Sequence, residues 1–223
     1  MIYLFCNEGY GEAFIRIARQ YSITRPHPML LVFSAKTIYP RDRMRRFISR
    51  GINFLLNQYS GIRLRHRWKM PVLLAEDVNA SPFSSRISSR DVGIIAGFNQ
   101  IFRKESIEKF RLLVNFHPSI LPLYRGPVPS FWCIKNREDK SGYTLHTVTE
   151  RIDCGDILFQ SEVPIGAIDD PNELDRKIAL DASETLWRFL DALNSDRPWE
   201  KVQLDANKIY KRHVDYVSFP NRR

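Results

Sequence analysis

The sequence has few cysteines and no long apolar run, and both absences exclude classes of protein. Its 223 residues include 3 cysteines, without a Cys-x-x-Cys spacing. This pattern argues against a disulfide framework or a zinc knuckle and favours a reducing compartment, which we expect to be the cytoplasm. No apolar run approaches the roughly 18 residues of a membrane-spanning helix. The N-terminus also lacks the basic and apolar segments of a secretory signal peptide.

Several site patterns are missing too. Gly9-Tyr10-Gly11 lacks the third glycine of the dinucleotide-binding fingerprint. No strand-turn-helix elbow surrounds Ser119, which argues against a serine nucleophile. His146 lies in an alternating apolar segment without a metal-ligand partner at a suitable spacing, so we interpret it as a structural or supporting residue. We predict no metal site.

Positive charge is what the sequence has in excess. The formal net charge is +9, while 43% hydrophobic and 26% charged residues are ordinary for a soluble globular protein. The excess favours anionic partners such as nucleotides, phosphates or nucleic acid. Basic residues concentrate between Arg41 and Lys69. This region is either a solvated surface or the face of a nucleic-acid-binding module.

Short apolar runs alternate with helical patterns in the first half of the chain, which is typical of parallel strands joined by helices. The sequence therefore predicts an α/β fold: an open, mostly parallel, twisted, Rossmann-like sheet with helices on both faces. The expected strands are 2–5, 29–33, 71–74, 92–97 and 112–116; the expected helices are 12–21, 41–57 and one ending near 107–110; residues 81–89 are expected to be loop.

The pattern changes after residue 140. Residues 143–148 and 157–164 alternate like a pair of strands, and 171–194 has the apolar spacing of a strong amphipathic helix that begins with Pro171. We expect one catalytic domain over 1–194 and a short extension over 195–223 that ends in a strand or tail. Apolar residues of the extension, from Tyr210 to Phe219, either seal a homodimer or pack back on the core.

The run Asn115-Phe116-His117-Pro118-Ser119 ends one of the expected strands. Residues i and i+2 of a strand share a face, so Asn115 and His117 point into the same space. Ligands of open α/β sheets gather at the carboxyl ends of strands. A carboxamide and an imidazole there suit a reaction that develops an oxyanion and moves a proton. Each residue taken alone also has a simpler interpretation, as a turn cap or a buried structural histidine.

This run and Tyr124-Arg125-Gly126-Pro127 together resemble the signature of the formyltransferases that use N10-formyltetrahydrofolate. Two further segments are similar to that family, in the same order: Ile94 to Phe102, which resembles the segment that holds the pterin, and Glu150 to Leu158, which resembles the segment with the catalytic aspartate. The resemblance implies that Asn115, His117 and Asp153 are catalytic. Asn115 would donate to the oxyanion and Asp153 would accept the amine proton, alone or as a unit with His117.

The resemblance also implies binding residues. The folate co-substrate would contact Phe98, Gln100, Ile101, Phe102, Ile152 and Asp156. The acceptor would contact Ser119, Tyr124, Arg125, Gly126 and Pro127, with Arg125 suited to a phosphate. A simpler interpretation is equally open for each set. Phe98, Ile101 and Phe102 can be core residues, and Tyr124 to Gly126 can be residues that pack within a loop.

We infer the acceptor from the features in which this sequence differs from the best-known members of the family that it resembles. About 30 residues follow Asn194, which we expect to be too few for the C-terminal barrel of methionyl-tRNA formyltransferase. The Tyr-Arg-Gly-Pro element differs from glycinamide ribonucleotide formyltransferase and is more similar to sugar N-formyltransferases. We therefore expect a nucleotide-linked amino sugar, such as a dTDP-4-amino-4,6-dideoxyhexose, as acceptor. The alternatives are another amine, namely glycinamide ribonucleotide or methionyl-tRNA, or hydrolysis of formyltetrahydrofolate.

Overall fold

The computed structural model describes residues 1–25, 27–35 and 50–194, with the backbone path alone given for 50–57. The chain forms two compact units, Met1–Leu113 and Val114–Arg223. The expected start of the basic helix at Arg41 and the extension 195–223 lie outside the described residues.

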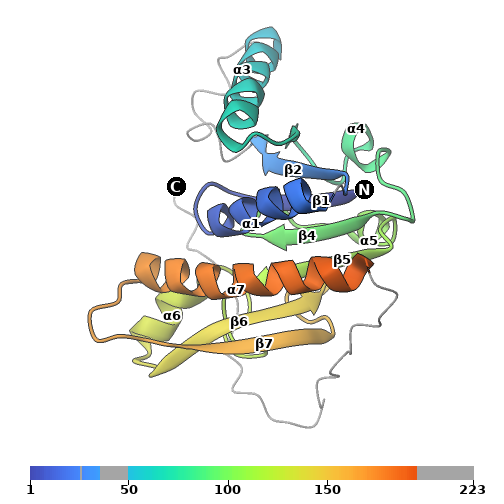
Figure 1. The fold of residues 1–223 in the computed structure, drawn as a ribbon. Coiled ribbons are helices and arrows are strands. Elements are labelled where there is room, and N and C mark those ends of the chain that lie inside the picture. The colour runs from blue at the N-terminus through green and yellow to red at the C-terminus, as the bar shows by residue number, and fades with distance from the viewer. Residues whose placement is uncertain (26, 36–49, 195–223) are drawn as a thin grey trace. The chain divides into compact units, whose positions relative to one another are not determined.

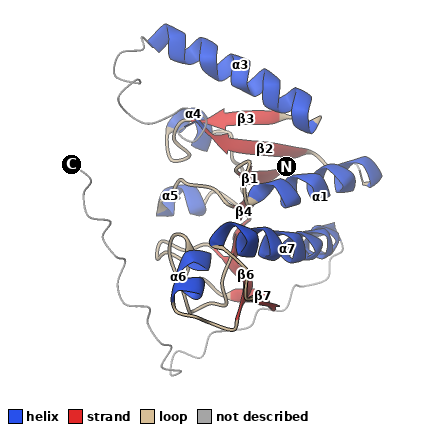
Figure 2. Cartoon of the chain, turned by 90° about the vertical axis from the view of Figure 1, so that its left-hand side faces the viewer, coloured by secondary structure: helices blue, strands red, loops and turns tan. Residues whose placement is uncertain are grey.

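The first unit is built on parallel strands, β1 (Ile2–Cys6), β2 (Met29–Ser34), β3 (Val72–Ala75) and β4 (Val92–Ala96), in the order β3-β2-β1-β4 (Figure 1, and Figure 2, where β3 is labelled). Every residue of β1 and β4 is buried. Burial on both faces explains why these strands are continuous apolar runs rather than alternating ones.

These strands are connected by helices α1 (Gly11–Thr24), α3 (Arg50–Trp68) and α4 (Ser81–Ser84), and a further short helix, α5 (Lys104–Ile107), follows β4. Helix α1 begins at a glycine because a Cβ at Gly11 would lie 2.7 Å from the Cβ of Cys6 and 2.8 Å from the carbonyl oxygen of Ala96. The Oδ1 atom of Asn7 accepts hydrogen bonds from the backbone N–H groups of Gly9 and Gly11. Helix α3 lies beside β3 (Figure 2).

The second unit is antiparallel. Strand β6 (Lys140–Thr147) pairs with β5 (Leu112–His117) on one side and with β7 (Ile157–Pro164) on the other. Two helices complete it, α6 (Pro129–Lys135) and α7 (Pro171–Asn194). Helix α7 packs on α6, β6 and β7 through one apolar stripe, which consists of Leu174, Ile178, Ala182, Leu186, Phe189 and Leu190.

The predicted fold class is confirmed: the seven strands form a mixed, mostly parallel open sheet of an α/β fold. The bounds of helix α7 are as predicted. The loop prediction for 81–89 is wrong at its start, because Pro82 near the N-terminus of α4 favours a short helical turn. Helix α6 was not predicted, and α3 continues to Trp68 rather than ending at 57.

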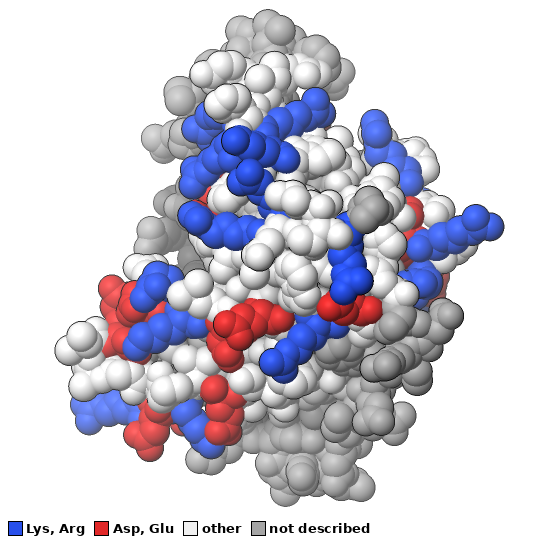
Figure 3. All heavy atoms as spheres, viewed as in Figure 1, with Lys and Arg blue, Asp and Glu red and all other residues white. Residues whose placement is uncertain are grey.

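Charge is distributed unevenly on the face shown in Figure 3. Lys and Arg side chains gather over α1 and α3, whereas basic and acidic side chains alternate over α7. In the first unit, Arg67 contacts Glu8 at 3.0 Å and Glu12 at 3.6 Å. Arg63 lies 3.7 Å from Glu8. Part of the positive charge of α3 is therefore neutralised within the unit. No helix in the part of the chain that the structure describes is long and apolar enough to cross a membrane.

Candidate active site

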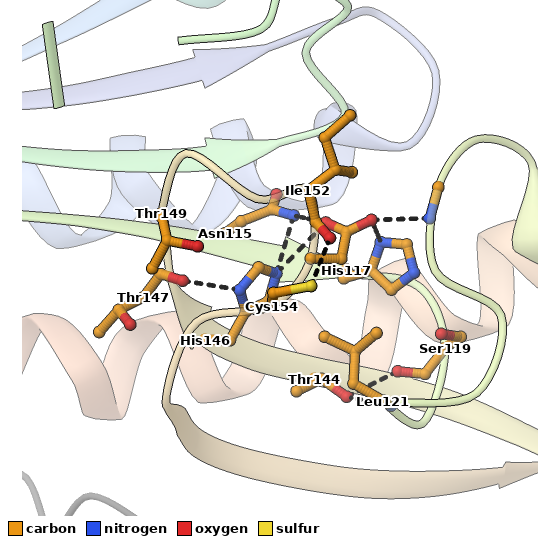
Figure 4. A network of polar contacts seen from close by, with 12 residues as sticks. Asn115, His117, Ser119, Leu121, Thr144, His146, Thr147, Thr149, Ile152 and Cys154 are labelled. Carbon is orange, nitrogen blue, oxygen red and sulfur yellow. Dashed lines mark hydrogen bonds and ion pairs between the residues drawn. The ribbon is translucent and has the colours of Figure 1, made fainter. Parts of the chain in front are cut away.

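Two neighbouring strands of the second unit carry the polar side chains of the candidate site (Figure 4). Asn115 of β5 is directly paired with His146 of β6. His117 follows Asn115 on the same face of β5. Both imidazoles are buried, with 4% of His117 and 2% of His146 exposed. The paired backbones therefore hold these groups within a few ångströms of one another.

Asp153 comes from the loop between β6 and β7, and its carboxylate meets all three side chains. Its Oδ1 atom lies 3.4 Å from Nδ2 of Asn115 and 3.5 Å from Nε2 of His146. Its Oδ2 atom lies 3.5 Å from Nδ1 of His117. The backbone N–H of Gly126 donates to Oδ2 at 2.8 Å. The structure thus brings together the residues that the sequence predicted to be catalytic.

The loop that carries Asp153 is held tightly against the end of β6. The backbone N–H of Thr147 donates to the carbonyl of Asp156, and the Thr147 hydroxyl accepts from the backbone N–H of Asp156. A Cβ at Gly155 would lie 1.7 Å from the carbonyl oxygen of Thr147. Only glycine allows this approach. Asp153 has a φ of +49°, in the left-handed region that aspartate and asparagine tolerate better than most residues.

The tautomer of His117 follows from its hydrogen bond. Its Nε2 atom lies 2.8 Å from the backbone carbonyl oxygen of Tyr124. Since a carbonyl only accepts, Nε2 carries the hydrogen. In the neutral ring, Nδ1 then has a free lone pair that faces the Asp153 carboxylate at 3.5 Å. Two acceptors face one another, and a proton placed between them would complete a hydrogen bond.

Burial and charge set the protonation of this pair. Burial lowers the pKa of His117 below its ordinary value, against the opposing effect of the Asp153 carboxylate. Burial also disfavours the charged form of Asp153, but the neighbouring His117 and His146 and the Gly126 N–H outweigh it and hold the pKa of Asp153 well below its usual range. The pair is therefore a neutral imidazole beside an ionised carboxylate near neutral pH.

We expect His117 to make the stability of the chain pH-dependent. Its pKa is lower in the folded chain than the ordinary 6.5. Hence the unfolded chain binds more protons below that pH, and the free energy of unfolding falls as pH decreases from 6.5. Urea unfolding between pH 8 and pH 5 measures this slope, and His117→Gln should reduce it. An unchanged slope in the variant would assign the pH dependence to other groups.

The loop before α6 is positioned by β6 and β7. The Thr144 hydroxyl donates to the carbonyl of Ser119 at 2.7 Å and accepts from the backbone N–H of Leu121 at 2.9 Å. Gln160 donates to the carbonyl of Leu121 and to the Thr144 hydroxyl. These contacts fix the path of the chain to Gly126, whose N–H reaches Asp153.

The residues predicted to bind the acceptor fall into two groups. Ser119 is fully buried and its hydroxyl donates to the carbonyls of Leu123 and Tyr124. Tyr124 is buried, and its hydroxyl donates to Glu138, which together with burial raises its pKa to about 12. Arg125 and Pro127 are exposed. Loop packing thus accounts for Ser119 and Tyr124, while Arg125 is free to meet a ligand.

The segment predicted to hold the pterin lies in the first unit. Phe98 and Phe102 pack against Phe5 with ring centroids 5.3 and 4.9 Å apart, and Ile101 is 64% exposed. The amide of Gln100 bonds to the Ser34 hydroxyl, the Ala75 carbonyl and the Val78 N–H. In the second unit, Ile152 is half-buried and Asp156 is exposed. Apolar surface at Phe98 and Ile101 suits a flat ring system, with Gln100 fixing their loop.

From the sequence alone, His146 is interpreted as a structural or supporting residue and is not placed in the site. The structure puts its Nε2 atom 3.2 Å from Nδ2 of Asn115. The signal that could have found it is the register of β5 and β6. That register is set by contacts between strands 31 residues apart, so no local pattern in the sequence gives it.

Comparisons with known proteins show what this chain is similar to. Residues 80–190 match the family model described as "Formyl transferase". The methionyl-tRNA formyltransferase of Ehrlichia canis (strain Jake) is 34% identical over 131 residues, which are 56% of this chain and 43% of that protein. The chain therefore spans less than half the length of this relative.

Solved structures share the fold at lower identity. A sugar N-formyltransferase from Shewanella sp FDAARGOS_354 has a TM-score of 0.65 and 22% identity, covering 93% of this chain and 74% of that one. Glycinamide ribonucleotide transformylase 1 from Symbiobacterium toebii has a TM-score of 0.64 and 17% identity, covering 92% and 93%. At these identities the likeness shows the shared fold alone.

Proposed function

We propose that this chain, a member of the formyl transferase family through residues 80–190, is an N-formyltransferase that moves the formyl group of N10-formyltetrahydrofolate to the amino group of a nucleotide-linked amino sugar. The observation that carries the chemistry is the meeting of Asn115, His117 and Asp153 in one cluster, in which His117 is buried and the other two are half-buried. No metal is required by this proposal. Phe98, Gln100, Ile101, Phe102, Ile152 and Asp156 remain the predicted folate-binding residues.

The proposed reaction uses each member of the cluster differently. The acceptor nitrogen forms a bond to the formyl carbon, and the formyl oxygen becomes an oxyanion. Asn115 donates from Nδ2 to this oxygen, a contact of the kind that contributes roughly 2.7–4 kcal/mol to a transition state. The bond from the carbon to N10 of folate then breaks, the formamide product is released, and N10 takes a proton.

We assign the acceptance of the amine proton to His117 and Asp153 together. A carboxylate with so low a pKa is a poor base on its own near neutral pH. The Nδ1 lone pair of His117 is available, and the adjacent charge of Asp153 stabilises the imidazolium that forms. The same proton can then pass to N10 as the carbon–nitrogen bond breaks. The pair thus accepts and returns one proton in each turnover.

The sugar acceptor is supported by Arg125, which adjoins the cluster, and by exposed side chains of α6 further along the chain. Gly126 touches Asp153 through its N–H, so its exposed neighbour Arg125 lies close to the reacting groups. On α6, the ring of Phe131 is 44% exposed and the Nζ atom of Lys135 lies 5.8 Å from its centroid. Two cations and an exposed aromatic ring match the chemistry of a nucleoside diphosphate.

An assay with a panel of acceptors tests the proposal. The full chain is incubated with N10-formyltetrahydrofolate and either dTDP-4-amino-4,6-dideoxyglucose, its 3-amino isomer, glycinamide ribonucleotide or methionyl-tRNA. Mass spectrometry then looks for one added formyl group. A formylated nucleotide sugar is the expected product. Exclusive formylation of another acceptor overturns the sugar assignment, and formate release without any acceptor favours a hydrolase.

Thermal unfolding gives a second test that does not depend on turnover. A ligand that binds only the folded chain raises its apparent stability, by about 2.7 kcal/mol at one hundred times its dissociation constant. We expect a dTDP-linked amino sugar to raise the unfolding temperature, and a formyltetrahydrofolate analogue to raise it further.

Methionyl-tRNA is the second candidate acceptor because the methionyl-tRNA formyltransferase of Ehrlichia canis matches at 34% identity. A tRNA acceptor would contact many phosphates, and its affinity would fall steeply with added salt. Against it, Arg63 and Arg67 of α3 already pair with Glu8 and Glu12. A weak dependence of the acceptor KM on salt would favour the small acceptor.

Replacing Arg125 with Ala is expected to raise the KM for the nucleotide-sugar acceptor about tenfold or more and to leave the KM for folate within about twofold. The expectation follows from the loss of a charge-assisted hydrogen bond to phosphate, worth roughly 1.5–3 kcal/mol. Arg90→Ala is the matched control, since Arg90 is an exposed arginine of the first unit and its loss changes the net charge equally. Equal effects of both substitutions would remove Arg125 from the acceptor site.

A further inference from the structure

His146 is a buried polar group beside the catalytic cluster that the proposed chemistry does not use. It lies on β6 directly opposite Asn115 of β5. The pairing of β6 with β7 has a register shift between Leu145 and His146. Such irregularities often redirect a side chain. With 2% of its surface exposed, the ring has little freedom to move.

The tautomer of His146 is determined by its own strand. Nδ1 lies 2.8 Å from the backbone carbonyl oxygen of Thr147. Because a carbonyl oxygen accepts and cannot donate, Nδ1 carries the hydrogen. In the neutral imidazole, Nε2 is then an acceptor. Oδ1 of Asp153 also lies 3.5 Å from Nε2, but the nearer group, at 3.2 Å, is the Asn115 carboxamide, and an acceptor Nε2 requires its NH2 end there.

The two hydrogens of the Asn115 amide therefore have different surroundings. One points to Nε2 of His146 at 3.2 Å, and the other faces Oδ1 of Asp153 at 3.4 Å. The second contact is long and weak for a hydrogen bond. The hydrogen that faces Asp153 is the one available to an oxyanion. The hydrogen bond to His146 keeps the amide group from rotating by half a turn. If the amide turned over, its Oδ1 atom would face the oxyanion, and two oxygens of like charge would repel.

We propose that His146 is a positioning residue: its Nε2 atom, made an acceptor by the Thr147 carbonyl, fixes the carboxamide of Asn115 with the NH2 end toward the reacting formyl oxygen. The inference rests on the proposed function, since it gives Asn115 the role of oxyanion donor. His146 itself touches neither substrate in this account. Its proposed contribution passes through Asn115, although Nε2 also lies 3.5 Å from Oδ1 of Asp153.

Nitrogen NMR of the full chain tests the geometry without any substrate. With 15N-labelled histidine, long-range 1H–15N correlation distinguishes a protonated Nδ1 from a protonated Nε2. We expect His146 in the Nδ1–H form, and we expect its Nε2 resonance to shift in Asn115→Ala. A protonated Nε2 in the unmodified chain, or a resonance that Asn115→Ala leaves in place, would overturn the proposal whatever the acceptor is.

Kinetics then tests the consequence, with the nucleotide-sugar acceptor. His146→Phe keeps a flat ring but removes the acceptor. It should lower kcat roughly 10–100-fold, by analogy with the loss of residues that orient metal ligands, with both KM values within about threefold. His146→Gln retains an acceptor oxygen and should recover most of the loss. In an Asn115→Ala background, His146→Phe should change kcat little further.

A merely structural role predicts different results. The effects of His146→Phe and Asn115→Ala would then multiply, and His146→Gln would not recover activity while the unfolding temperature fell in parallel. Failure of the proposed function is recognised separately: Asn115→Ala would then leave kcat unchanged, whereas the NMR result for His146 would still report the orientation of the amide.

Discussion

Replacing Asp153 with Asn is expected to lower kcat for formyl transfer roughly 10²–10⁴-fold, the range for loss of a group that acts in proton transfer. The substitution removes the charge that faces Nδ1 of His117 at 3.5 Å. Without that charge, the imidazolium formed on proton uptake is buried and unpaired, because His117 is 4% exposed. Initial rates with saturating folate and acceptor measure the effect.

The fold should tolerate this change. Asparagine accepts the left-handed backbone at residue 153, where φ is +49°. Its side-chain oxygen can still accept the hydrogen bond from the Gly126 N–H. Glu150→Gln is the control, because Glu150 is an exposed carboxylate near the same loop and should retain full activity. Near-normal turnover of Asp153→Asn, with an unchanged unfolding temperature, would remove the carboxylate from the mechanism.

Replacing Asn115 with Ala is expected to lower kcat about 10²–10³-fold, the cost typical of deleting one oxyanion donor. The reason is that one hydrogen on Nδ2 faces Oδ1 of Asp153 at 3.4 Å, which is too long for a strong hydrogen bond, and so is available to the oxyanion. The loss should appear in kcat rather than in KM, since the contact strengthens only when the formyl oxygen becomes charged.

Two measurements separate this outcome from simple damage. The unfolding temperature of Asn115→Ala reports whether the cluster still packs, and the KM values report whether the ground state still binds. A loss confined to KM would mean that Asn115 binds substrate instead of stabilising the transition state. A kcat within about threefold of the unmodified chain would contradict its role as the oxyanion donor.

The central strands and the positions of Asn115 and His117 could be predicted from the sequence because their causes are local. Leu112–His117 is a short apolar run, and the period of a strand places residues 115 and 117 on one face. The helix Pro171–Asn194 could be predicted equally well, because its apolar stripe repeats over many turns. In both cases one stretch of the chain contains the whole signal.

No local pattern gives the surroundings of Asp153, because they depend on contacts between distant segments; only the family resemblance implied that Asp153 acts with Asn115 and His117. The Gly126 N–H and the carboxylate are separated by 27 residues, and no local pattern indicates that they meet. The position of His146 beside Asn115 depends on strand register over 31 residues. Helix α6 was missed because Pro127 and Pro129 look like loop, although Pro129 only occupies the first position of the helix.

The position of the Asp153 carboxylate is sensitive to substitution of Gly155. This glycine supplies no functional group, yet a single methyl there would collide with the carbonyl of Thr147 at 1.7 Å and push the adjoining carboxylate away from its partners. A relative could thus preserve the amide, the imidazole and the acid and still be inert. Before such a relative is judged to be an enzyme, the residue at the position of Gly155 has to be examined together with the catalytic side chains.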